Sequence, residues 1–321
     1  MRLLFLSISL IFIVKFMHSQ GCSDAGACSV GSLELKDNSR DKTGLLLGYQ
    51  QSLGLADKEA LVAGTELFLE HRILKNTSLE FRLPYYVTIG NLATTSGVGD
   101  LLVSVSQHLL QSETGRLTFI TGGRLKTNDA DKSKDGEPLP MVYQSSLGTY
   151  DIIAGLAWQT KKWSFSVGYQ HPFGANENKY LHPDSVELPD NKQYYESAYL
   201  KRGDDLMLRI QRTVTLNEKS TVNFGFLPIY RIQKDEIKRN GVYEQLPGSS
   251  GITYNVFFNW YKKLGQNKQF VLTTGIPVHA REYRADGLTR TAIVSAGLIF
   301  SFHQKQDKLL QENMFDSLHQ E

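Results

Sequence analysis

The chain has 321 residues, 35 basic against 33 acidic side chains and a formal net charge of +2. A near-zero charge gives no basic surface for nucleic acid, and beyond the N-terminus no apolar run reaches the ~18 residues that a membrane helix needs. The mean hydropathy of −0.28 is slightly polar, which fits a soluble protein but also a membrane β-barrel, because only alternate barrel residues face lipid.

The first 20 residues have the pattern of a secretory signal peptide. Arg2 supplies a positive charge, residues 3–14 form a short apolar run, and residues 16–20 lead to Gly21. The run is too short for a membrane anchor, so we expect export with removal of residues 1–20.

The segment 21–42 lacks alternation and contains the only two cysteines, Cys22 and Cys28. An oxidising compartment favours a Cys22–Cys28 disulfide. A lipid-modified Cys22 is the alternative, although the preceding Ser-Gln-Gly differs from the Leu-Ala-Gly type of lipoprotein motif. A metal site is disfavoured because the segment offers too few further ligands. We expect this segment to lie at the periplasmic rim or to plug a barrel lumen.

From residue 43 to residue 303, alternating segments are separated by polar turns. In Trp163–Gln170 the odd-numbered residues are apolar and the even-numbered residues are small or polar. Because successive side chains of a strand point to opposite faces, such a segment predicts a strand with one apolar face. About twelve strands are expected, near residues 43–55, 59–73, 77–89, 99–110, 115–126, 148–160, 162–171, 197–214, 219–233, 251–262, 268–280 and 290–303.

A soluble β-sandwich also alternates, so three further features decide the fold. Several segments exceed the five or six residues of typical globular strands and suit a tilted span of about 9–11 residues. Short turns alternate with longer polar loops, as at the two rims of an outer-membrane barrel. Aromatic residues gather near strand ends, where they would meet the lipid–water interfaces. We therefore predict an all-β protein with a single antiparallel transmembrane β-barrel over residues 43–303, located in the cell outer membrane.

Charged residues within the strands are assigned to the barrel lumen. An Arg or Lys turned toward the lipid mid-plane would cost about 2–4 kcal/mol. Neighbouring Glu and Arg would form ion pairs that brace or narrow the lumen, or alternatively a selectivity constriction whose arginines favour anionic solutes. The candidates are Glu66, Glu70, Arg72, Glu80, Arg82, Arg124, Asp205, Arg209, Arg231 and Arg281.

The sequence contains no catalytic motif of a known type: no Gly-x-Ser-x-Gly elbow, no His-Glu-x-x-His and no phosphate-binding glycine loop. His108 and Ser106 lie two residues apart on one predicted strand, but a polar stripe lining the lumen explains them better than a catalytic pair. We therefore expect no enzyme, no cofactor and no metal.

The last predicted strand resembles the C-terminal assembly signal of bacterial outer-membrane proteins. Ser295, Gly297, Phe300 and Phe302 fill its polar, glycine and aromatic positions, although residues 304–321 follow it. The resemblance implies recognition by the barrel-assembly machinery and pairing of this strand with the first one. Residues 304–321 place apolar side chains at helical spacing, which predicts a periplasmic amphipathic tail.

A wider resemblance is carried by two glycine–aspartate strand openings. Gly97-Val-Gly99-Asp100-Leu-Leu-Val-Ser and Gly203-Asp204-Asp205-Leu-Met-Leu are similar to openings in the transporter-like barrels grouped with phenol-degradation-operon and long-chain fatty-acid channel proteins. Residues 20–28 resemble the start of a class of Bacteroidota outer-membrane proteins.

These resemblances imply an outer-membrane channel or transporter-like barrel that passes a small solute. A non-conducting structural or interaction barrel is the alternative, and an outer-membrane hydrolase is less favoured. The expected partners are outer-membrane lipid, the barrel-assembly machinery and the small solute; nucleic acid is not expected. The oligomeric state is left open.

Overall fold

The computed structural model describes residues 44–74, 76–182, 193–287 and 290–302. The predicted signal peptide at 1–20, the segment 21–42 with its proposed Cys22–Cys28 disulfide, and the tail at 304–321 lie outside the described residues. Within the described ranges, no helix is both long and apolar enough to cross a membrane.

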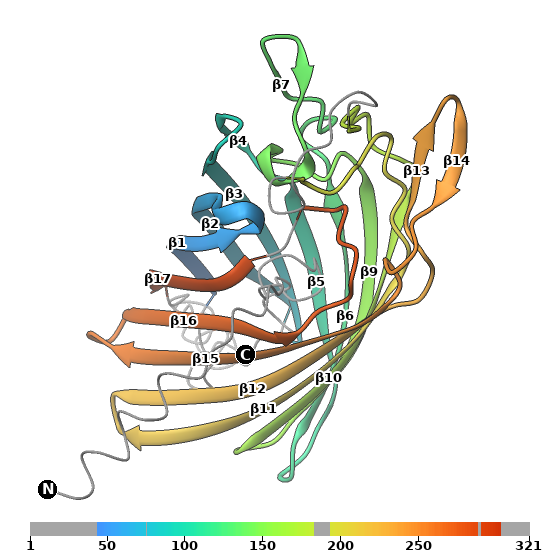
Figure 1. Ribbon diagram of the computed structural model, residues 1–321. Coiled ribbons are helices and arrows are strands. Elements are labelled where there is room, and N and C mark those ends of the chain that lie inside the picture. The colour runs from blue at the N-terminus through green and yellow to red at the C-terminus, as the bar shows by residue number, and fades with distance from the viewer. Residues whose placement is uncertain (1–43, 75, 183–192, 288–289, 303–321) are drawn as a thin grey trace, which may run out of the picture.

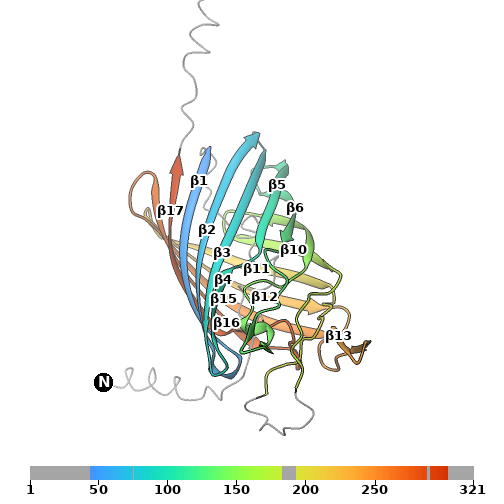
Figure 2. The ribbon, with the colours of Figure 1, turned by 90° about the horizontal axis from the view of Figure 1, so that it is seen from above.

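Twelve antiparallel strands form a closed β-barrel (Figures 1 and 2). Each pairs with its neighbours in the order of the chain, and the last strand pairs with the first. The predicted all-β fold with about twelve barrel strands is confirmed. The strands are β1 (Leu45–Ala56), β2 (Leu61–Leu74), β3 (Thr77–Ile89), β5 (Leu101–Gln111), β6 (Arg116–Leu125), β9 (Tyr150–Gln159), β10 (Trp163–Phe173), β11 (Asp205–Asn217), β12 (Ser220–Arg231), β15 (Gly251–Lys263), β16 (Lys268–His279) and β17 (Arg290–Phe302).

The two ends of the barrel differ. At one end, tight turns join neighbouring strands such as β5 to β6 and β9 to β10. At the other, which we call the loop end, the connections carry additional elements, and Figure 1 shows several of them gathered together. These elements are η2 (Asp57–Glu59), β4 (Thr94–Val98), the hairpin of β7 (Ser133–Lys134) and β8 (Glu137–Pro138), η3 (Met141–Tyr143), and the hairpin of β13 (Glu236–Arg239) and β14 (Val242–Gln245).

The outward face of the barrel is apolar, as the alternation predicts. On β10, Trp163, Phe165 and Val167 are exposed on the outside, whereas Ser164 and Ser166 are buried inside. Because an outer-membrane barrel presents such a band to hydrocarbon, these exposed apolar side chains are the surface that lipid would cover.

One predicted strand boundary is wrong. The strand predicted over residues 197–214 begins only at Asp205. The preceding residues pair with a loop hairpin instead, since the backbone N–H groups of Lys201 and Glu236 each donate to the other residue's carbonyl at 2.8 and 2.9 Å. The assignment of Arg281 to a strand is also wrong, because β16 ends at His279 and Arg281 lies in the following loop.

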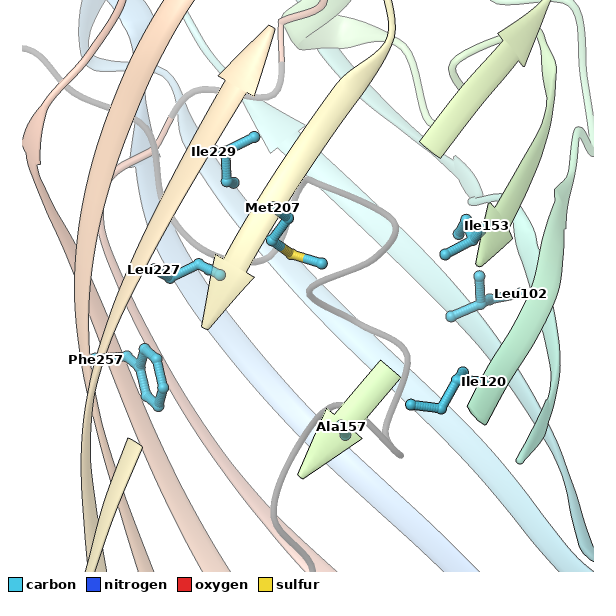
Figure 3. Close-up of a cluster of buried hydrophobic side chains, with 8 residues drawn as sticks. All are labelled: Leu102, Ile120, Ile153, Ala157, Met207, Leu227, Ile229 and Phe257. Atoms are coloured by element: carbon cyan, nitrogen blue, oxygen red, sulfur yellow. The ribbon is translucent and has the colours of Figure 1, made fainter. Parts of the chain in front are cut away.

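Apolar side chains also occupy part of the lumen. Figure 3 shows Met207, Leu227 and Ile229 on one wall facing Ile153 and Leu102 on the other. The alternation of polar and apolar residues does not predict this inward cluster. Its members are Leu102, Ile120, Ile153, Ala157, Met207, Leu227, Ile229 and Phe257.

Candidate solute-binding cavity in the barrel lumen

A cavity of about 180 Å³ lies in the lumen. It lies partly beside the inward apolar cluster, since Leu102 and Phe257 belong to that cluster and also line the cavity. Inward-facing residues of β1, β2, β3, β5, β6, β11, β15, β16 and β17 surround it, and loop residues from Met141 to Leu147 contribute to its wall. Charged groups of both signs face it. They are Glu66, Arg82, Asp100, Arg124, Arg209 and Asp286.

On the β2–β3 wall, one arginine holds two carboxylates. Arg82 Nη1 donates to Glu66 Oε1 at 2.8 Å and Arg82 Nε donates to Glu80 Oε1 at 2.7 Å. The guanidinium also lies over the ring of Phe68, with Cζ 4.9 Å from the ring centroid. The structure therefore brings together three of the predicted lumen residues in an ion-pair cluster that braces β2 against β3.

Two further predicted lumen residues lie farther along the same strand. Glu70 and Arg72 share the inward face of β2 with Glu66 and are half-buried near the tight turn to β3. Among the described residues that line the cavity, neither Glu70 nor Arg72 is included. Their position places them nearer to the tight-turn end than to the cavity.

At the loop end, a second cluster joins three predicted residues to two that sequence reasoning missed. Arg231, at the end of β12, donates from Nε to Asp205 Oδ1 at 2.7 Å and from Nη2 to Asp286 Oδ2 at 3.2 Å, and it also bonds to Asp235. Arg281 Nη2 donates to Asp286 Oδ2 at 2.5 Å. Buried charges need such partners, because an unpaired charge loses its hydration without compensation. Asp235 and Asp286 lie in loops, where alternation gives no signal.

A third buried pair lies beside this cluster. Arg202 Nη2 donates to Asp151 Oδ1 at 2.6 Å, and Arg124 Nε lies 3.9 Å from Asp151 Oδ2. Asp151 is the register partner of Arg124 on the neighbouring strand. The sequence carried a signal for Asp151, since it occupies an inward position of a predicted strand. It carried none for Arg202, which falls within the strand predicted over residues 197–214 but lies in the loop before β11.

The two glycine–aspartate openings hold loop segments in place. Asp100 accepts a hydrogen bond from the backbone N–H of Leu147 at 3.0 Å and so attaches the loop after β6 to the start of β5. Asp204 accepts from Tyr169 Oη and His171 Nδ1, both at 2.6 Å. In this protein the recurring motif therefore anchors loop-end structure.

Loop segments of the loop end pack into a cap, which we define as residues 126–149, 174–182, 193–204, 232–250 and 280–287. Tyr143 is fully buried, and its hydroxyl bonds to Asn91 Oδ1 at 3.1 Å and to Tyr194 Oη at 3.0 Å. Two apolar clusters lie within or against the cap, one around Tyr143 and Val142 and another around Met141 and Leu200. The long polar loop expected at 127–146 is thus partly a folded core.

Arg209 differs from the other predicted lumen residues. Its Nε donates to Gln211 Oε1 at 3.2 Å, and its Cζ lies 4.2 Å from the centroid of the Phe257 ring. Its Nη1 is buried and has no hydrogen-bond partner among the described residues. One edge of this guanidinium is therefore left for a group that enters the cavity.

The residues of the proposed assembly signal lie on the closing strand. Ser295 and Gly297 face inward, and Phe302 is exposed on the outside. Gln50 Nε2 donates to Ser295 Oγ at 2.6 Å, which links β1 to β17. A Cβ on Gly297 would lie 2.6 Å from the carbonyl oxygen of Tyr49, so the close approach of the two strands requires glycine here.

Within the described part of the chain, no three His, Cys, Asp or Glu side chains are grouped closely enough to hold a metal ion. His108 Nδ1 lies 3.0 Å from Thr118 Oγ1 on the neighbouring strand. This hydrogen bond places His108 in a polar lumen wall together with Ser106.

The sequence matches no protein-family model and no curated protein. Among solved structures, the chain is similar to an outer membrane channel from Pseudomonas putida F1, with a TM-score of 0.58 and 14% identity over 84% of this chain and 100% of that one. A NanC porin gives a TM-score of 0.46 and 10% identity over 81% and 100% of the two chains. A CymD monoaromatic hydrocarbon channel gives 0.40 and 8% over 82% and 90%.

At these identities the similarity shows the fold alone. The fold is that of an outer-membrane β-barrel, and the first of these structures has the clearest overall likeness. The two lower TM-scores carry no argument about this chain.

Proposed function

We propose that this protein is an outer-membrane channel through which a small solute passes. The observation that carries the proposal is the lumen cavity, where polar and charged side chains lie among apolar ones on strands from opposite sides of the barrel. A barrel whose interior holds a hydrated polar space offers a route across the membrane, and the charge of its lining selects among solutes. The resemblance of the strand openings to transporter-like barrels supports the same function.

Conductance in planar lipid bilayers tests the proposal directly. Purified, refolded protein is expected to give discrete current steps. Thr273 lines the cavity, whereas its neighbour Thr274 is on the outward face of β16. Thr273→Trp is therefore expected to lower the unit conductance several-fold by filling the lumen, while Thr274→Trp leaves it unchanged. Equal conductance in the two variants would contradict passage through this cavity.

A second candidate function is a non-conducting structural or interaction barrel. The packed cap favours it, because Tyr143 is fully buried and the ion pairs of Arg231 and Arg281 are buried as well. Wild-type protein that inserts into bilayers without current steps would support this second function. Current steps from a variant shortened in the cap but not from the wild type would instead identify the cap as a closed gate.

The remaining parts of the proposal concern the location of the protein in the cell and the class of protein to which it belongs. We infer export by a cleaved signal peptide, residence in the outer membrane, and kinship with Bacteroidota outer-membrane proteins. We also propose that the chain is not an enzyme. A lipid-hydrolysis assay of the purified barrel tests that last point, and turnover that His108→Ala abolishes would overturn it.

A further inference from the structure

The buried arginines of the barrel divide into two classes. Of the described arginine side chains, seven are buried, and six of them form an ion pair with a carboxylate: Arg82, Arg124, Arg202, Arg231, Arg281 and Arg284. Arg209 is the seventh, only 3% exposed. Its contacts are the amide of Gln211 and the ring of Phe257, and neither neutralises its charge.

A buried cation without a counter-charge is strongly unfavourable. Arg209 lines the lumen cavity, and within the described part of the chain its Nη1 has no hydrogen-bond partner. The ring of Phe257 holds one face of the guanidinium, so the plane of the group is fixed before any solute arrives. An oxyanion that reaches this edge would gain charge-assisted hydrogen bonds from a planar donor fork.

Amide side chains with unpaired buried polar atoms lie beside Arg209 on the same wall of the lumen. Asn259 is 1% exposed and lines the cavity with Arg209, and no described residue bonds to its Nδ2 or its Oδ1. Asn255 and Asn259 flank Phe257 on the inner face of β15, and Asn223 is the register partner of Asn259. Gln211 Nε2, Asn223 Oδ1 and Asn255 Oδ1 are also buried without a partner in the described ranges. The wall therefore offers both donors and acceptors.

We propose that Arg209 and Asn259, with Phe257 and Gln211 beside them, form a binding subsite for a small solute that carries both a carboxylate and hydroxyl groups. The guanidinium would bind the carboxylate. A hydroxyl both donates and accepts, so it matches an amide that has a free N–H and a free oxygen. This proposal rests on the proposed channel function and names the class of solute for that lumen.

Isothermal titration of the folded, detergent-solubilised full chain tests the subsite, with D-gluconate as the probe and D-glucose as the uncharged comparison. Wild-type protein is expected to bind gluconate saturably and glucose at least tenfold more weakly. Arg209→Gln should weaken gluconate binding about tenfold or more, because the charge-assisted hydrogen bonds are lost. Arg209→Lys should lie between the two, since a point charge replaces the fork.

The matched control is Arg212→Gln. Arg212 lies on the same strand but faces outward, with its Cζ 5.0 Å from the centroid of the Trp163 ring, so gluconate binding should not change. Asn259→Leu should weaken binding of gluconate about threefold, as expected for one neutral hydrogen bond. The shift of folded barrel on unheated gels verifies that each variant is folded before titration.

The proposal is overturned if folded Arg209→Gln binds gluconate as tightly as the wild type, or if the wild type conducts but shows no saturable gluconate binding. Saturable binding that depends on Arg209 in a protein that gives no current steps would support the subsite and overturn only the channel function. Equal affinity for gluconate and glucose would show that the carboxylate of the solute does not contribute to binding, which overturns that part of the proposal.

Discussion

Arg231 and Arg209 are both buried arginines that face the interior of the barrel, but their surroundings differ. Arg231, at the loop end, contacts three carboxylates of Asp205, Asp235 and Asp286. Arg209, deeper in the lumen, contacts an aromatic ring and one amide, and part of its guanidinium faces the cavity. The difference teaches how to interpret a charged lumen: a charge compensated within the protein supports the architecture, whereas an uncompensated one is available to a solute.

Replacing Arg231 should have the largest effect on stability. Arg231→Met would remove the counter-charge shared by three buried carboxylates, of which Asp286 keeps its ion pair with Arg281, at a cost of about 3–5 kcal/mol in the free energy of unfolding. Urea unfolding followed by tryptophan fluorescence measures it. The control is Lys201→Met, since the side chain of Lys201 is 55% exposed and that of its partner Glu236 is 27% exposed; its cost should stay below about 1 kcal/mol. Equal losses in both variants would refute a special role of the buried cluster.

Acid should weaken the same cluster. Burial alone would raise the pKa of Asp286, but Arg281 and Arg231 outweigh it and hold that pKa well below its ordinary value. Because the folded pKa is lowered, the stabilisation is fully present above the ordinary value of about 4 and is lost as the pH falls through the folded pKa.

Limited proteolysis with pepsin is the measurement for this acid effect. Cleavage within the cap should increase steadily below about pH 4, where the unfolded-state carboxyl begins to bind protons. Asp286→Asn should lower stability at neutral pH and flatten the acid response. If pepsin cleavage of the cap in Asp286→Asn kept the full pH dependence of the wild type, the acid effect would have to come from other carboxyl groups.

Within the cap, the buried hydroxyl of Tyr143 should have an intermediate effect. Tyr143→Phe keeps the ring but removes the bonds to Asn91 and Tyr194, at a cost of about 1–2 kcal/mol because the partners stay buried. Tyr243→Phe serves as the control, since Tyr243 is 44% exposed on β14. Hydrogen exchange of the cap amides would detect the loss, and equal exchange in both variants would contradict it.

Replacing Arg209 should have the smallest effect on stability, and this distinguishes Arg209 from Arg231. Arg209→Met should change the unfolding free energy by less than about 1 kcal/mol, or increase it, because no carboxylate is left behind. The same urea titration as for Arg231→Met gives the comparison. A loss from Arg209→Met as large as that from Arg231→Met would show that Arg209 supports the fold.

Much of the barrel could be predicted because the direction of each side chain depends only on its position along its own strand. Alternation along a strand such as β10 assigns each side chain to lipid or lumen, and the cross-strand partners Asp205 and Arg231 lie on two consecutive predicted strands. Even the cluster of Glu66, Glu80 and Arg82 follows from inward positions on paired strands. These assignments need no knowledge of distant parts of the chain.

The cap and the subsite could not be predicted in the same way. Asp286 and Arg202 reach their partners from loops, where no periodicity relates sequence position to direction. The position of Arg209 over Phe257 depends on a contact between β11 and β15, two strands that are separated by β12. Its charge within a predicted strand marks Arg209 as a lumen residue, but only the assembled barrel shows that no carboxylate of the described residues forms an ion pair with it.

The seam between β1 and β17 has a consequence for how this chain matures. Its two sides are residues 45–56 and 290–302, so the contact of greatest sequence separation is also the one that closes the sheet. Such a contact forms slowly, since the chain between its two sides must be ordered first. Until the 13 residues of β17 are in place, β1 and β16 present open edges that invite pairing with other chains. A nascent chain interrupted before Arg290 would therefore be an aggregation hazard rather than a smaller barrel.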